Sequence, residues 1–219
     1  ATVVVHSTKE PFLAWDDLRR MAAVRSLAAC DVKSGETREV IAQTKLNSYD
    51  LSEDGALLTY QEDITKKTDY EVIFGSENQV MAKPAAGGEA RTLLKSTKGI
   101  TLIWSRDGRH YAYAKDGNLF TTSVDDKEAR QITGKKDEKT EAAKDDSKDA
   151  DKKKEKEKFS AVRLSAKGNW LIASSKEGLW LVDAATGAKE NFLKMNEEDK
   201  EAPRYQVIEW NGDDIYLTY

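Results

Sequence analysis

A short motif recurs along this chain, and it constrains the fold more than any other feature of the sequence. In one copy, Ser-Arg-Asp-Gly at 105–108 is followed by the alternating run Tyr-Ala-Tyr-Ala at 111–114 and then by Asp116-Gly117. Ser-x-Asp-Gly is typical of a tight turn, because Ser and Asp side chains bond nearby backbone groups and Gly accepts a positive φ. A period of two indicates a β-strand, and Asp-Gly indicates a hairpin turn. The stretch 103–120 therefore predicts three strands joined by two tight turns.

The motif returns three more times with varied residues. The related stretches, the last of which breaks off after its second strand, begin near residues 49, 162 and 207. In two copies the turn glycine and the leucine that opens the third strand have the same separation, Gly108 to Leu119 in one and Gly168 to Leu179 in the other. Agreement at two hairpin positions indicates an internal repeat.

Repeats of roughly 40–50 residues with four strands each indicate a β-propeller. We therefore predict an all-β fold of four-stranded antiparallel blades, with about four and a half blades present as part of a larger propeller. The single partial propeller domain would span 1–219. Its predicted blades cover 1–45, 46–97, 98–134, 159–194 and, incompletely, 204–219.

The sequence also predicts several local features. The apolar spacing near 15–23 predicts a short helix. Strands are expected at 37–41 and, separately, from residue 49, and the polar segment 61–71 is expected to be irregular. Cys30 is expected to be half-buried in a strand, and because it is the one cysteine, no disulfide can form within the chain.

The segment 135–158 consists almost entirely of interspersed lysines and acidic residues. Such a segment buries too little apolar surface to offset the entropy of ordering it. We predict a solvated, disordered insertion between two blades. A single solvated helix held by ion pairs four residues apart is the alternative.

The charge balance weighs against one class of partner. Lys and Arg number 35 and Asp and Glu number 39, which gives a net charge of −4. This balance provides no overall basic field for nucleic acid, although a local basic face stays open. No apolar run approaches the roughly 20 residues of a membrane span, so none is expected.

The first residue is Ala1 rather than Met, which suggests a processed or excised product. A removed signal peptide is compatible with that start. The single cysteine fits a reducing compartment and equally an exported protein without disulfides. A periplasmic or exported bacterial protein is favoured, and a cytoplasmic one is the alternative.

The repeat resembles that of TolB-type, WD-like propellers, whose pattern is Trp-Ser-Pro-Asp-Gly, a strand, Asp-Gly, a strand and a closing Leu-Thr. The matching residues are Trp-Ser-Arg-Asp-Gly at 104–108, Ile-Thr at 132–133 and Leu-Ser-Glu-Asp-Gly at 51–55. Arg106 and Glu53 stand where the pattern has Pro. The likeness supports the fold strongly and the function weakly.

A narrower resemblance concerns the whole run from residue 12 to 219. With Trp-Asp-Asp-Leu-Arg-Arg at 15–20 and Asp-Val-Lys-Ser-Gly-Glu-Thr-Arg-Glu at 31–39, it is similar to the N-terminal propeller of prolyl oligopeptidase-family serine peptidases. That family includes dipeptidyl-peptidase-like and acylaminoacyl-peptidase-like hydrolases. The resemblance implies a propeller of about seven or eight blades that caps a C-terminal α/β-hydrolase domain.

The catalytic part of such a protease has no counterpart in this sequence. No Gly-x-Ser-x-Gly nucleophile elbow occurs, and the two histidines, His6 and His110, allow no Ser-His-Asp set to be assigned. We assign no catalytic residue and expect no cofactor. The prediction is a propeller portion that gates and contacts short peptide substrates for a catalytic domain absent from this chain, so whether the chain is itself an enzyme stays open. The alternative is a non-enzymatic TolB-like propeller that serves as a protein-interaction scaffold.

Glu62 and Asp63 are the candidate substrate-binding residues. In the resembled family, enzymes that remove dipeptides use propeller acids to hold the amino terminus of the substrate, and paired carboxylates facing a central cavity would do this through charge-assisted hydrogen bonds. Solvated loop acids without a ligand are the alternative interpretation. No metal site is predicted: Asp50-x-Ser-x-Asp-Gly resembles half of an EF-hand loop, but Gln61 stands where a bidentate Glu is required.

Four ring side chains are interpreted as structural. Trp104, Trp170 and Trp210 are expected to pack between blades, with ligand stacking as the alternative, and His110 is expected at the surface or between blades.

If the polypeptide ends at Tyr219, an open arc of blades would expose sheet faces and favour self-association.

Overall fold

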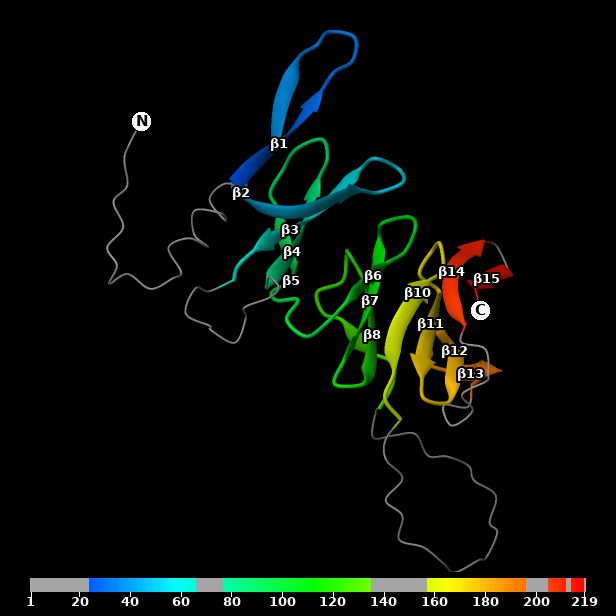
Figure 1. Ribbon diagram of the computed structural model, residues 1–219. Coiled ribbons are helices and arrows are strands. Elements are labelled where there is room, and N and C mark those ends of the chain that lie inside the picture. The colour runs from blue at the N-terminus through cyan, green and yellow to red at the C-terminus, as the bar shows by residue number, and fades with distance from the viewer. Residues whose placement is uncertain (1–23, 66–76, 135–156, 196–204, 212–213, 219) are drawn as a thin grey trace, which may run out of the picture. The chain divides into compact units, whose positions relative to one another are not determined.

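The computed structural model describes residues 24–65, 77–134, 157–195, 205–211 and 214–218 (Figure 1). Every regular element in these ranges is a β-strand. The strands are β1 Val24–Cys30, β2 Thr37–Leu51, β3 Leu57–Asp63, β4 Asn78–Pro84, β5 Arg91–Leu94, β6 Leu102–Trp104, β7 His110–Lys115, β8 Asn118–Ser123, β9 Arg130–Gln131, β10 Ser160–Leu164, β11 Trp170–Ser175, β12 Gly178–Asp183, β13 Lys189–Lys194, β14 Gln206–Asn211 and β15 Asp214–Thr218. None of the described segments forms a helix of the length and apolarity that crossing a membrane requires.

The chain divides into two compact units, 1–98 and 99–219. The first contains one five-stranded sheet in the order β1-β2-β3-β4-β5, in which each strand pairs antiparallel with the next. Its core lies along β2 and β3 and consists of Val40, Ile41, Leu46, Leu58 and Tyr60.

Strand β2 differs from the sequence-based expectation. The two strands expected at 37–41 and from residue 49 are one continuous strand of 15 residues. Its first part pairs with β1 and its last part with β3, and the buried side chains of Val40, Ile41 and Leu46 stabilise it. β2 therefore crosses the predicted blade boundary at 45–46 without a break, and the blade boundaries stay predictions.

The second unit contains three sheets. β6-β7-β8-β9 and β10-β11-β12-β13 are four-stranded, and β14-β15 is two-stranded (Figure 1). In each sheet, neighbouring strands are consecutive in the chain and antiparallel, as in a propeller blade. The predicted all-β fold of four-stranded antiparallel blades is confirmed, and the chain is an unclosed part of a β-propeller.

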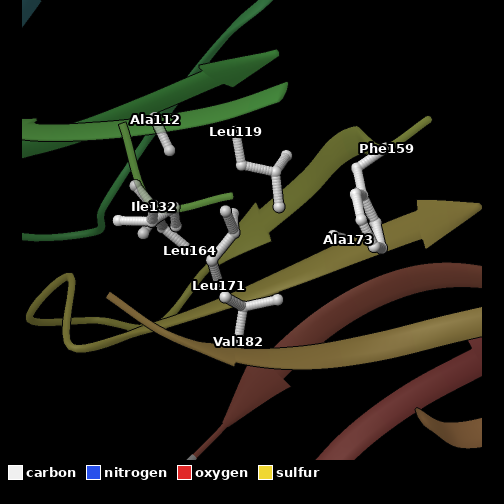
Figure 2. Packing of buried hydrophobic residues seen from close by; sticks show 8 residues of the cluster. All are labelled: Ala112, Leu119, Ile132, Phe159, Leu164, Leu171, Ala173 and Val182. Carbon is white, nitrogen blue, oxygen red and sulfur yellow. The ribbon is translucent and has the colours of Figure 1, made fainter. Parts of the chain in front are cut away.

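Strand β11 is buried on both faces of its sheet. Leu171 and Ala173 lie in a cluster that β7 and β8 also supply, whereas Ile172 belongs to a second cluster with Val207 of β14. Because successive side chains of a strand alternate between faces, sheet β10–β13 must pack against a neighbour on each side. Figure 2 shows the first cluster, formed by Ala112, Leu119, Ile132, Phe159, Leu164, Leu171, Ala173 and Val182.

The repeated motif forms the same turn in three copies. In each, the Ser N–H donates to the carbonyl five residues on, and the Gly N–H donates to the Ser carbonyl. The two distances are 2.8 and 2.8 Å at Ser52, 2.9 and 3.0 Å at Ser105, and 2.9 and 2.9 Å at Ser165. The Ser hydroxyl also accepts the N–H five residues on, at 2.9–3.0 Å. The motif is therefore a blade corner, as its local chemistry predicts.

Corners of adjacent sheets contact each other in the second unit. The Asp107 N–H donates to the Ala166 carbonyl at 3.1 Å. Gly168, with φ +72°, lies so close to His110 that a Cβ on it would be 2.5 Å from the His110 Cβ. His110 thus lies between sheets, in agreement with the expectation for this residue.

Other expectations are corrected or fall outside the described residues. Cys30 is exposed rather than half-buried, because β1 lies at the edge of its sheet. The helix expected at 15–23, His6 and residues 135–156 of the charged insertion lie outside the described ranges.

Replacing Gly168 by Ala tests the close contact between corners. Gly168→Ala combines an unfavourable φ with a clash against His110, so we expect a loss of about 2–4 kcal/mol in the free energy of unfolding. Gly55→Ala is the matched control at the same motif position, since Gly55 has φ +68° and nothing within 4 Å of its Cβ position. It should cost about 1 kcal/mol, the backbone contribution alone. Urea unfolding measures both, and equal losses would contradict the contact.

Candidate functional site

Glu62 and Asp63 are the last two residues of β3 rather than part of an irregular loop. β3 continues this far because Glu62 and Asp63 pair in register with Gln79 and Asn78 of β4. The Gln79 Nε2 donates to the Glu62 carboxylate at 2.5 Å. The Thr65 N–H donates to the Asp63 Oδ1 at 2.8 Å, which caps the turn that follows.

As neighbours on a strand, these two side chains point to opposite faces of the sheet. The structure therefore places the carboxylates next to each other in the chain but does not direct them to one point. Both are partly buried, and both accept a hydrogen bond within the first unit, Glu62 from Gln79 of β4 and Asp63 from Thr65 of the following turn. Their role in binding a substrate stays a prediction.

A groove in the second unit is the stronger candidate. It encloses a cavity of about 790 Å³ and draws residues from three consecutive sheets. They are Trp104, Arg106, Arg163, Leu164, Ala166, Glu209, Trp210, Asn211 and Tyr216.

The first strand of each sheet supplies most of this groove. Trp104 ends β6, Arg163 and Leu164 end β10, and the residues from 209 to 211 end β14. β10 contacts β6 on one side and β14 on the other. The groove therefore lies where the first strands of the three sheets meet.

Two arginines provide the positive charge of the groove. Arg163 is fixed by its Nη2, which donates to the Ile208 carbonyl of the next sheet. Its Nε is buried and has no hydrogen-bond partner among the described residues. Arg106 lies exposed in the corner turn between Ser105 and Asp107.

Three aromatic residues, Trp104, Trp210 and Tyr216, also line the groove. Trp104 contacts Tyr111 at a centroid distance of 4.9 Å, and Trp210 packs against the cluster between β10–β13 and β14–β15. Tyr216 is 52% exposed. The groove therefore combines cationic donors with apolar ring surfaces.

The turn that carries Arg106 is held by its neighbours. The Ser105 hydroxyl donates to the Asp107 Oδ1 at 2.5 Å, and the Arg109 N–H donates to the same oxygen at 2.9 Å. Partial burial acts to raise the pKa of Asp107. The hydrogen bonds from Ser105 and Arg109, with the His110 imidazole at 3.5 Å, outweigh burial and hold that pKa below its ordinary value.

The expected packing of the tryptophans is confirmed in part. Trp210 packs between two sheets, but Trp104 and Trp210 also line the groove. Trp170 is 41% exposed at the start of β11, so the expectation that it is packed is wrong. Trp170 begins β11, the second strand of its sheet, whereas Trp104 and Trp210 lie on β6 and β14, the first strands of their sheets.

Sequence reasoning did not single out the arginines as site residues. Arg106 stands where the repeat pattern has Pro, but so does Glu53 in the corner of the first unit, and both are exposed, so the position gives no signal by itself. Arg163 carries no signal either, because its place in the groove depends on the meeting of three sheets.

The half EF-hand resemblance is explained by the corner turn of the first unit. The Ser52 hydroxyl donates to the Asp54 Oδ1 at 2.6 Å, and the Ala56 N–H donates to the same oxygen at 3.0 Å. Within the described ranges, no group of three or more His, Cys, Asp or Glu side chains could hold a metal ion.

Comparisons with known proteins agree with the architecture. No protein-family model matches the chain, and no curated protein matches it. Among solved structures, one from a study of two prolyl endopeptidases is similar to this chain with a TM-score of 0.51 and 12% sequence identity. The alignment covers 89% of this chain and 29% of the other protein's chain. The chain is part of a β-propeller.

Two further solved structures have lower scores. Acylaminoacyl peptidase from Pyrococcus horikoshii matches 84% of this chain with 30% of its own, at 13% identity and a TM-score of 0.45. A protein described as a putative TolB from Agrobacterium tumefaciens aligns over 78% of this chain and 55% of its own chain, at 17% identity and a TM-score of 0.42. The chain thus spans about a third or less of the two peptidases and about half of the TolB-type protein.

The lowered pKa of Asp107 predicts a pH dependence of stability. Because the folded-state pKa is depressed, the ionised carboxylate stabilises the fold above the unfolded pKa of about 3.9, and this contribution is lost as the pH falls through the folded-state pKa. The free-energy difference between the parent chain and Asp107→Asn should therefore shrink as the pH is lowered from 7 to 3. Urea unfolding at each pH measures it. The exposed Glu53→Gln serves as a control, and a difference for Asp107→Asn that does not change with pH would refute this account.

Proposed function

We propose that this chain is the propeller portion of a prolyl oligopeptidase-like serine peptidase that acts on short peptides. In this proposal the propeller gates access to the active site and contacts the substrate. An α/β-hydrolase domain outside this chain performs the chemistry.

One observation carries the proposal. The match to the prolyl endopeptidase structure covers 89% of this chain but 29% of that one, which leaves most of the longer protein for other domains. The Trp-Ser-x-Asp-Gly corners, which resemble the repeat of such propellers, support the same assignment.

The architecture suits a gate. Sheets that pack on both faces form a rigid wall, and a channel between such sheets admits an extended short peptide but excludes a folded protein. The cationic and aromatic groove supplies contacts along that channel. Glu62 and Asp63 are proposed to bind the amino terminus of the peptide.

The proposal also includes the remaining partners and the location. Self-association is proposed for a chain limited to these blades, because Ile208 is exposed on the two-stranded sheet β14–β15. We further propose an exported bacterial protein.

The complete reading frame tests the proposal. We expect the sequence beyond Tyr219 to encode further blades and then a Gly-x-Ser-x-Gly elbow. The full-length protein should hydrolyse a short chromogenic peptide and leave a folded protein substrate intact, and replacing the elbow Ser by Ala should abolish the activity. The 219-residue chain alone should show none. A stop codon within one blade of Tyr219 would overturn the peptidase proposal and favour the TolB-like scaffold.

A further inference from the structure

We propose that the groove along β6, β10 and β14 is a binding site for the free carboxylate of a short peptide. Arg106 and Arg163 hold the carboxylate, and Trp104, Trp210 and Tyr216 receive the apolar side chain beside it. The site goes beyond the peptidase assignment, because it requires no catalytic domain and would serve a scaffold equally well.

The charge of the groove favours an anion. Two guanidinium groups line it, and the ion pairs of the described residues, His110 with Asp107 and Lys189 with Glu157, include neither of them. Glu209 is the acid among the lining residues, and its Oε1 accepts the Trp210 N–H at 3.1 Å, which directs it to its own strand. Among the charged residues that line the groove, two arginines therefore outnumber one glutamate.

Arg163 presents a donor that lacks an acceptor. Its Nε is buried and makes no hydrogen bond with any described residue, although its Nη2 is bonded to Ile208. A buried donor without a partner is costly and uncommon. Because the guanidinium is already anchored at Nη2, its other N–H groups can bind a ligand carboxylate with little loss of side-chain entropy.

The surroundings favour a peptide carboxylate over a bare anion. Rings from three strands and Leu164 offer apolar surface beside the cations, and the exposed Asn211 amide can both donate to and accept from a peptide backbone. A cavity of about 790 Å³ falls in the range of roughly 300–1,000 Å³ that small-ligand sites occupy. Arginine matches the planar, two-oxygen shape of a carboxylate.

Titration of the complete 219-residue chain with Ala-Ala-Phe tests the proposal, with Trp104 and Trp210 as fluorescence reporters and calorimetry for the affinity. We expect saturable binding that weakens about tenfold or more for the C-terminally amidated peptide, since the amide lacks the anion that makes a charge-assisted bond. Binding of the amidated peptide with unchanged affinity would overturn the carboxylate assignment. Inorganic phosphate that binds more tightly than the peptide would overturn it as well.

Arg106→Gln is the diagnostic variant, because Arg106 is exposed in a turn and its removal should leave the fold intact. It should weaken Ala-Ala-Phe binding about tenfold or more. Lys167→Gln is the matched control: it removes one positive charge from the neighbouring corner at an exposed residue outside the groove, and it should bind like the parent. Equal affinities of Arg106→Gln and Lys167→Gln would overturn the site. The two proposals can fail separately. If the chain binds Ala-Ala-Phe but the complete reading frame encodes no Gly-x-Ser-x-Gly elbow, the peptidase assignment is wrong and the carboxylate site is still supported.

Discussion

Face-to-face apolar packing of consecutive sheets is the interaction on which the second unit depends. Leu171 and Ala173 on one face of β11, and Ile172 on the other, are all fully buried. A four-stranded antiparallel sheet with one neighbour could leave a polar face to water. Burial of both faces requires a neighbour on each side, and that requirement turns a chain of separate hairpin sheets into a series of blades.

The corners convert this packing into a defined geometry. A backbone hydrogen bond from Asp107 to Ala166 and the close contact of Gly168 with His110 fix how one sheet meets the next. Corner residues also present Arg106 at the ends of the first strands, where side chains from three sheets form the groove. The same repeat therefore builds the fold and places the candidate binding site.

Local features of this structure could be predicted from the sequence, and features that depend on distant contacts could not. The turn at 105–108 and the hairpin at Asp116-Gly117 follow from residues within a few positions of each other. The continuity of β2 depends on two different partner strands, and the extension of β3 to Asp63 depends on its pairing with Asn78. The groove depends on three sheets, so Arg106 and Arg163 could be identified as its lining residues only in the folded structure.

A double-mutant cycle between Leu119 of β8 and Leu171 of β11 tests the packing of neighbouring blades most directly. Both side chains are fully buried and belong to one cluster, although they lie on different sheets (Figure 2). Each change to Ala should cost about 2–5 kcal/mol in unfolding free energy. The account predicts that the double variant departs from the sum of the two by about 0.5 kcal/mol or more. Losses that add to within about 0.3 kcal/mol would show that the two sheets do not pack against each other through these residues and would contradict the account.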